Sequence, residues 1–258
     1  MAQASDTEQP SLADALKRRQ QHTRTMIFLI LGVVAFGIAL MLLSLVSGPR
    51  SVYEGIPQAF NASDHAPVLG HWQEAPVTLT VFLDFADIRS ARLHKTLLQL
   101  VDPYLRPGTV VLVEYLLVTF GPYQADSRMA AEAAFCAGEQ GAFWQMHDAL
   151  FNLWERQFEA FGRIQAPPPA FRETAITLAA QQIQIDPAEV LACISEGRQR
   201  TPLDAGISVA NALGITSVPA VYINTAPMTD ESGNPVTEPT LAQLQAALDA
   251  ASARVTGQ

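Results

Sequence analysis

The chain has 258 residues, 49% of them hydrophobic, and its formal net charge is −9 at pH 7. Four of its sixteen Lys and Arg residues and three of its 25 Asp and Glu residues fall within residues 1–25, so the remainder carries a net charge of −10. This acidic balance excludes typical nucleic-acid binding and adsorption to anionic lipid, and it favours another protein as the partner.

The first element in chain order is an uncharged stretch of 21 residues, from Met26 to Val46. It is long enough to cross about 30 Å of hydrocarbon as a helix. A cleaved signal peptide is the alternative, but its apolar region would span only about 7–15 residues, and Pro49 is a poor residue after the best cleavage point. The sequence therefore predicts one uncleaved transmembrane helix at 26–46.

The flanks of this helix predict its orientation in a bacterial cell membrane. All four basic residues of the tail 1–25 precede it, whereas only Arg50 follows closely. We therefore expect a cytoplasmic tail and an extracytoplasmic, periplasmic domain. Gly32, Ala35 and Ala39 share one face of the helix, where small side chains let a second helix approach closely.

After the helix, residues 47–75 are rich in Gly, Pro, Ser and Asn and predict a linker. Residues 76–258 are enough for one buried core. They begin with apolar strands at 77–85 and 109–117 around a helix at 90–104, a β-α-β unit. The later predicted elements are a helical region at 127–153 interrupted at Gly138 and Gly141, helices at 171–184, 187–196 and 201–213, a strand at 220–224 and a helix at 240–255.

Local motifs of this domain resemble those of the DsbA-like thioredoxin family. They are Asp84-Phe85, Ser127-x-x-Ala130-Ala131-x-Ala133-Ala134-x-Cys136-Ala137, Gln140-Gly141-x-Phe143-Trp144-x-x-His147-Asp148, and Gly214-Ile215-Thr216-Ser217-Val218-Pro219 before Ile223-Asn224. The resemblance implies an α/β, thioredoxin-like fold with an inserted helical domain at about 125–213, here preceded by one transmembrane helix.

The sequence departs from the family at the redox site. Where the family carries Cys-x-x-Cys, this chain reads Asp87-Ile88-Arg89-Ser90, and neither Asp nor Ser can exchange a disulfide. The position of the family's buried acid in the first strand holds Val81. We therefore predict a pseudoenzyme, that is, a family member that is not an enzyme, and we expect no cofactor.

Pro219 matches the family's cis-proline and completes the degenerate site with Asp87 and Ser90. It can serve as a rigid turn that closes the sheet, or it can border a groove that still pairs with an extended peptide. Both interpretations stay open.

Cys136 and Cys193 fall on predicted helices of the insert. In an oxidising compartment outside the membrane, an isolated pair favours a structural disulfide, whereas two reduced core cysteines would be expected in the cytoplasm. The predicted topology favours the disulfide.

Two other groups of residues are candidate sites. Asp87, Ser90 and His94 lie within eight residues, but no nucleophile elbow accompanies them, and Ser90 is a better candidate for a helix N-cap. The five histidines show no metal-ligand spacing, so we predict no metal site. These histidines are His22, His65, His71, His94 and His147.

The sequence supports three functional hypotheses. The first is a redox-inactive, membrane-anchored accessory subunit of a larger membrane complex, in electron transport or envelope assembly. Its contacts would be the small face of the anchor and Arg89 on the outer domain. The second is a peptide-binding chaperone that uses the groove beside Pro219. The third, least favoured, is a thiol oxidoreductase that uses Cys136 and Cys193.

Overall fold

The computed structural model forms two compact units, Met1–Ser51 and Val52–Gln258. In the first unit residues 29–38 are helical, and this helix includes Gly32 and Ala35. None of the helices that the structure describes is both long and apolar enough to cross a membrane. Residues 27–28 and 39–46 of the predicted anchor, with Ala39, lie outside the described residues. The described residues are 26, 29–38, 51–119, 122–161 and 170–257.

The second unit is built on a six-stranded mixed sheet with the strand order β1-β2-β4-β3-β5-β6. Only β3 and β4 pair in parallel, as the predicted β-α-β unit requires, and the other neighbours are antiparallel. The strands are β1 (Gln58–Phe60), β2 (Pro67–Leu69), β3 (Val77–Leu83), β4 (Val110–Leu116), β5 (Ala220–Ile223) and β6 (Ala226–Pro227).

The strands β1 and β2 lie in the segment for which the sequence predicts a linker. They extend the sheet beyond β4, and Phe60 of β1 packs edge-on against Phe143 with ring centroids 5.7 Å apart. Each strand has only three residues, which is too short for an alternating pattern to stand out between turn residues. The thioredoxin-like unit therefore begins before residue 76.

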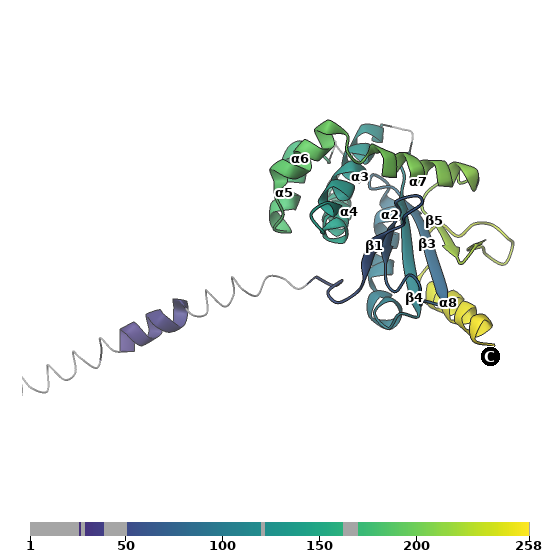
Figure 1. The fold of residues 1–258 in the computed structure, drawn as a ribbon, viewed down its shortest axis with the longest axis horizontal. Helices are drawn as coiled ribbons and strands as arrows, with labels where there is room; N and C mark the ends of the chain where they lie inside the picture. Colours follow the sequence, from purple (N-terminus) through teal and green to yellow (C-terminus); the bar gives the residue numbers. More distant parts are fainter. Residues whose placement is uncertain (1–25, 27–28, 39–50, 120–121, 162–169, 258) are drawn as a thin grey trace, which may run out of the picture. The chain divides into compact units, whose positions relative to one another are not determined.

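Helices cover the sheet on both faces, with α2, α4 and α8 on one and α7 on the other, and Figure 1 shows α7 (green) above the strands and α8 (yellow) below and to the right of them. The predicted helix 127–153 is divided in two at Gly141, which has a φ of +72° that favours glycine. The helices are α2 (Ile88–Leu98), the π-helical turn η1 (Val101–Leu105), α3 (Gln124–Gly138), α4 (Phe143–Phe161), α5 (Glu173–Gln182), α6 (Pro187–Glu196), α7 (Arg200–Ala212) and α8 (Leu241–Thr256).

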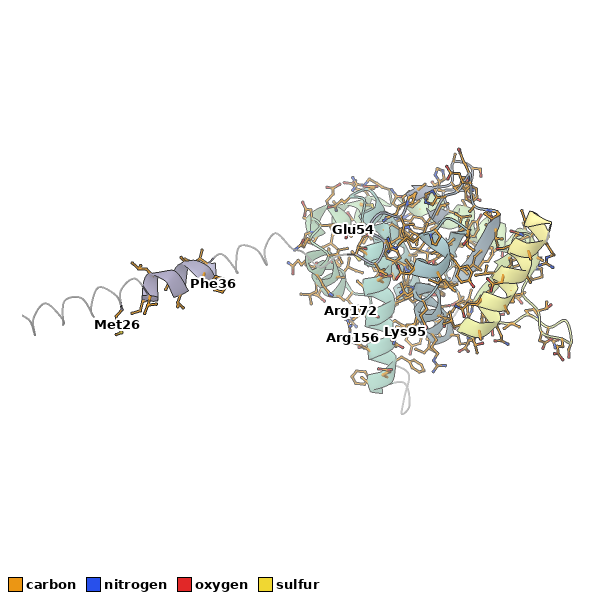
Figure 2. The ribbon with its side chains drawn as sticks, turned by 90° about the horizontal axis from the view of Figure 1, so that it is seen from below. Met26, Phe36, Glu54, Lys95, Arg156 and Arg172 are labelled. Carbon is orange, nitrogen blue, oxygen red and sulfur yellow. A yellow bond between two sulfur atoms is a disulfide. The ribbon has the colours of Figure 1, made fainter. Side chains whose placement is uncertain are left out.

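Alternation along β3 divides the core between the two faces. Val81 and its neighbours at odd positions pack with α2, α4 and α8, whereas Phe82 packs with Tyr115 and α7 on the other face. The insert is joined to the first face where α2 meets α4. There Lys95, labelled in Figure 2, places its Nζ 2.5 Å from Glu155. Side chains of α2 and α4 can therefore meet beneath the sheet.

Candidate functional site

Asp84 organises the turn between β3 and α2. Its buried carboxylate accepts hydrogen bonds from Ala86 N at 2.8 Å, Thr119 N at 2.9 Å, Thr119 Oγ1 at 2.5 Å and Ser127 Oγ at 2.6 Å. These bonds join the end of β3 to the loop after β4 and to α3. Asp84 thus fixes the backbone at the edge where the family carries its redox site.

The segment at 87–90 forms an ordinary helix start. Asp87 is the N-cap of α2 and its Oδ1 accepts from Ser90 N at 2.8 Å, so the prediction that Ser90 caps the helix is wrong. Ser90 is buried, and its hydroxyl accepts from Asp84 N at 3.2 Å. Arg89 pairs with Asp87 at 3.1 Å, and its side chain remains 39% exposed. Its predicted role in partner contact stays a prediction.

Pro219 lies at the same edge of the sheet. The Val218–Pro219 bond is cis, and the pairing of Phe82 with Ala220 places Pro219 beside the carboxyl end of β3. A groove of about 520 Å³ runs next to this loop, and we call it the Pro219-loop groove. It is lined by residues after β4 (117–119), by Gln124 and Arg128 of α3, by Asp204, Ile207, Ala210 and Asn211 of α7, and by Ile215–Val218 of the loop.

A second polar group lies inside the core, on the face covered by α2 and α4. Glu114 of β4 is fully buried, and its Oε1 lies 2.5 Å from Nε2 of His147, which is 1% exposed. His94 of α2 places Nε2 3.2 Å from Asp148 Oδ1, and Nδ1 of His147 lies 3.7 Å from the same oxygen. Tyr53 donates its hydroxyl to that oxygen at 2.5 Å. We call these five residues the His94–His147 cluster.

Burial and charge act in opposite directions on this cluster. Burial lowers the pKa of His94 despite the nearby Asp148. Burial also disfavours the charged form of His147, but Glu114 and Asp148 outweigh it and raise the pKa to about 9. Burial would raise the pKa of Asp148, yet the two imidazoles hold it at about 2. The cluster is therefore a buried polar network in which the pKa of His94 is lowered and the pKa of His147 is raised.

Sequence reasoning missed Glu114, although it is the single acidic residue in an otherwise apolar strand. Glu114 pairs in register with Val81, and both side chains face the same core. The domain thus has a buried carboxyl group directly across from the position where the family's acid is absent. His94 and His147 come together only because α2 packs on α4, which sequence spacing cannot reveal.

The other candidate residues lie apart from both sites. His71 is near Glu74 on the surface, with 3.6 Å between Nδ1 and Oε2. His22 lies outside the described residues. Cys136 of α3 and Cys193 of α6 form the predicted disulfide, and both are buried. They are the only two cysteines of the chain.

Solved structures with the same fold carry a thioredoxin-like domain. BdbD from Bacillus subtilis, in its oxidised form, is similar with a TM-score of 0.59 at 15% identity, over 76% of this chain and 98% of that one. The thiol-disulfide exchange protein alpha-DsbA2 from Wolbachia pipientis is similar with a TM-score of 0.52 at 15% identity, over 77% of this chain and 89% of that one. These likenesses concern the fold.

One curated relative matches a smaller stretch. The Na(+)/H(+) antiporter NhaA 3 from Salinispora tropica is 37% identical over 83 residues, which are 30% of this chain and 11% of the antiporter. The chain thus spans about a tenth of the length of this relative.

The prediction that the chain is not an enzyme is wrong. The structures with the same fold include a thiol-disulfide exchange protein, and the chain holds a disulfide of its own. The prediction rested on the loss of the Cys-x-x-Cys motif at residues 87–90 and kept an oxidoreductase that uses Cys136 and Cys193 only as the least favoured hypothesis. It gave too little weight to a sulfur pair that two distant helices bring together.

The family follows from a match that covers most of the chain. A family model described as thioredoxin matches residues 63–250. The match contains β3, β4, the inserted helices, the cis-proline and most of α8, and it agrees with the DsbA-like arrangement of the solved neighbours. The chain therefore belongs to the thioredoxin family, with a DsbA-like fold.

Proposed function

We propose that this protein acts outside the cytoplasm as a membrane-tethered, thioredoxin-fold subunit that binds an extended segment of a membrane transport protein. The segment lies in the Pro219-loop groove. The observation that carries this proposal is the groove itself, about 520 Å³ in volume, between α7, the start of α3, the residues after β4 and the loop 215–218 that precedes Pro219.

The chemistry of the groove suits a polypeptide. Leu117, Ile207 and Ala210 supply apolar side chains, while Gln124 and Asn211 supply amides that can bond to a peptide backbone. A few polar groups in an apolar concavity are typical of sites that fix the orientation of a bound chain. The pair Arg128–Asp204, at 3.8 Å, adds one charge of each sign.

Two observations support a membrane transport protein as the partner. A stretch that resembles this chain occurs within a Na(+)/H(+) antiporter. The apolar sequence 26–46 would hold the domain at the membrane. Tethering there would raise the effective concentration of the groove relative to the segment of a membrane partner. The disulfide agrees with an oxidising compartment outside the cytoplasm.

The test is copurification of the tagged full chain from its own membranes in mild detergent. We expect a stoichiometric complex with a larger membrane protein. Asn211→Trp fills the groove and should lower the recovered complex about tenfold, which is the effect expected when a central contact is lost. Ala212→Trp is the matched control, because this exposed neighbour does not line the groove. A lone chain, or equal loss in both variants, would reject the proposal.

The disulfide favours a second function, thiol-disulfide exchange. A thiolate of a reduced substrate attacks one sulfur of the pair, a mixed disulfide forms, and the other cysteine leaves as a thiolate. The second substrate thiol then attacks the mixed disulfide. The substrate ends oxidised, and Cys136 and Cys193 end reduced. Both sulfurs are buried, so α6 must open from α3 for attack to occur.

This exchange is measured in a single turnover. The oxidised protein is mixed with an excess of a reduced dithiol peptide, and the oxidised peptide and the new protein thiols are counted. We expect one peptide oxidised per chain, and none with Cys193→Ala. Ser195→Ala on the same helix is the control. Peptide oxidation that persists in Cys193→Ala would exclude the pair as the redox centre.

A further inference from the structure

We propose that His94, His147 and Asp148 form a binding site for one divalent metal ion of the zinc class, with Glu114 as the outer partner of His147. Each of the three offers one ligand atom, and these atoms lie within 4.8 Å of one another. They come from α2 and α4, so the ion would join the thioredoxin core to its helical insert.

Three ring nitrogens of the site have no hydrogen-bond partner. Nε2 of His94 and both ring nitrogens of His147 are buried, and none of them makes a hydrogen bond in the part of the chain that the structure describes. Asp148 Oδ1 lies 3.2 Å from Nε2 of His94 and 3.7 Å from Nδ1 of His147, yet its direction does not suit an N–H donor. Buried polar atoms without partners are rare. A metal ion between Nε2 of His94, Nδ1 of His147 and Asp148 Oδ1 would give both of these nitrogens a partner.

Glu114 prepares His147 for this role. Its Oε1 lies 2.5 Å from Nε2, on the opposite side of the ring from Asp148. In many zinc sites a carboxylate beside the second ring nitrogen keeps the proton there and leaves the other nitrogen for the metal, and a small turn of the His147 ring would bring Glu114 into that role. The metal ion would then bind Nδ1 of His147 in place of the proton that this nitrogen carries in the imidazolium form.

The balance of charge also favours a cation. The cluster contains two carboxylates, and no Lys or Arg pairs with either of them among the described residues. A divalent ion would neutralise both carboxylates, whereas the imidazolium of His147 can neutralise only one of them. Two imidazoles with one carboxylate suit Zn²⁺, whereas Mg²⁺ and Ca²⁺ prefer oxygen ligands.

A cavity of about 10 Å³ lies beside the cluster, lined by Tyr53, His94, Glu114 and His147 and otherwise by apolar side chains, and Asp148 does not line it. Bonds of about 2.0–2.1 Å require the ligand atoms to draw together by roughly 1 Å. Asp148, 23% exposed, provides the path from solvent. A water or the Tyr53 hydroxyl would occupy the fourth position.

The experiment uses the purified full chain in detergent, stripped with chelator and then titrated with zinc chloride. We expect one Zn²⁺ per chain, a higher Tm in the loaded protein, and binding at least about tenfold weaker in His94→Gln and Asp148→Asn. His71→Gln is the matched control, since His71 is an exposed histidine beside a glutamate.

A second measurement protects against variants that fail to fold. Co²⁺ bound to the unmodified chain should give visible absorption bands typical of nitrogen and oxygen ligands in a four-coordinate site. Absence of stoichiometric binding, or equal affinity in His94→Gln and the unmodified chain, would overturn the proposal. Loss of binding in His71→Gln would place the ion on the surface. None of these readouts depends on a membrane partner.

Discussion

Replacing both Cys136 and Cys193 with alanine should lower the free energy of unfolding by about 4 kcal/mol. The two residues are separated by 57 positions, so the disulfide closes a long loop and removes many conformations from the unfolded chain. The loop contains α4 and α5 as well as the segment outside the described residues, and the bridge ties α6 back to α3. The disulfide is therefore the main covalent restraint on the insert.

The measurement is urea unfolding of the oxidised full chain, followed by circular dichroism, for the unmodified protein and the double variant. Ser195→Ala is the control, because this exposed residue lies on α6 and bonds only to a carbonyl of its own helix. Its effect should stay within about 0.5 kcal/mol. A loss below 1 kcal/mol in the double variant would mean that packing alone holds the insert.

The same bridge links stability to the proposed exchange chemistry. If the pair is reduced in a catalytic turn, the insert loses this restraint while α3, α5 and α6 keep their packing contacts. Val190 and Ile176 are fully buried there and would preserve a core in the reduced form. A disulfide that both stabilises the fold and takes part in exchange must be able to open without unfolding the domain. Its reduction then lowers the free energy of unfolding, but the remaining core keeps the domain folded.

The parts of the fold that could be predicted are those with long, regular patterns. β3 and β4 are continuous apolar runs, and α6 begins with Asp186 and Pro187 and ends before Gly197, so its start and stop signals are local. β1 and β2 escaped prediction because three residues cannot show a period. The helix cap was assigned to Ser90 instead of Asp87, although both types cap well, because the sequence does not show which residue leaves the helical conformation.

The candidate sites were less accessible from the sequence. The family motifs placed Pro219 and the residues at 87–90, but the Pro219-loop groove depends on how α7 lies against the end of β4. The His94–His147 cluster depends on contact between α2 and α4 and on one acidic residue in β4. Such clusters arise from packing between distant segments, so neither the spacing of the residues nor the amino-acid composition predicts them.

Asp84→Ala should be among the most destabilising single substitutions in the chain, with an expected loss of about 3–5 kcal/mol. The change removes the acceptor for Ala86 N, Thr119 N, Thr119 Oγ1 and Ser127 Oγ. Buried donors left without an acceptor keep their full desolvation cost. Because Thr119 also lines the Pro219-loop groove, the same change should weaken partner binding.

Asp87→Ala is the matched control, three residues away and of the same chemistry. Its Oδ1 accepts one backbone hydrogen bond at the start of α2, so the loss should be about 1 kcal/mol. Urea unfolding of both variants gives the comparison, and Asp84→Asn separates loss of the negative charge from loss of the acceptor oxygens. If Asp84→Ala costs no more than Asp87→Ala, water has replaced the lost acceptor. In that case Asp84 does not hold the loop after β4 against β3 and α3, and the groove owes its shape to α7 alone.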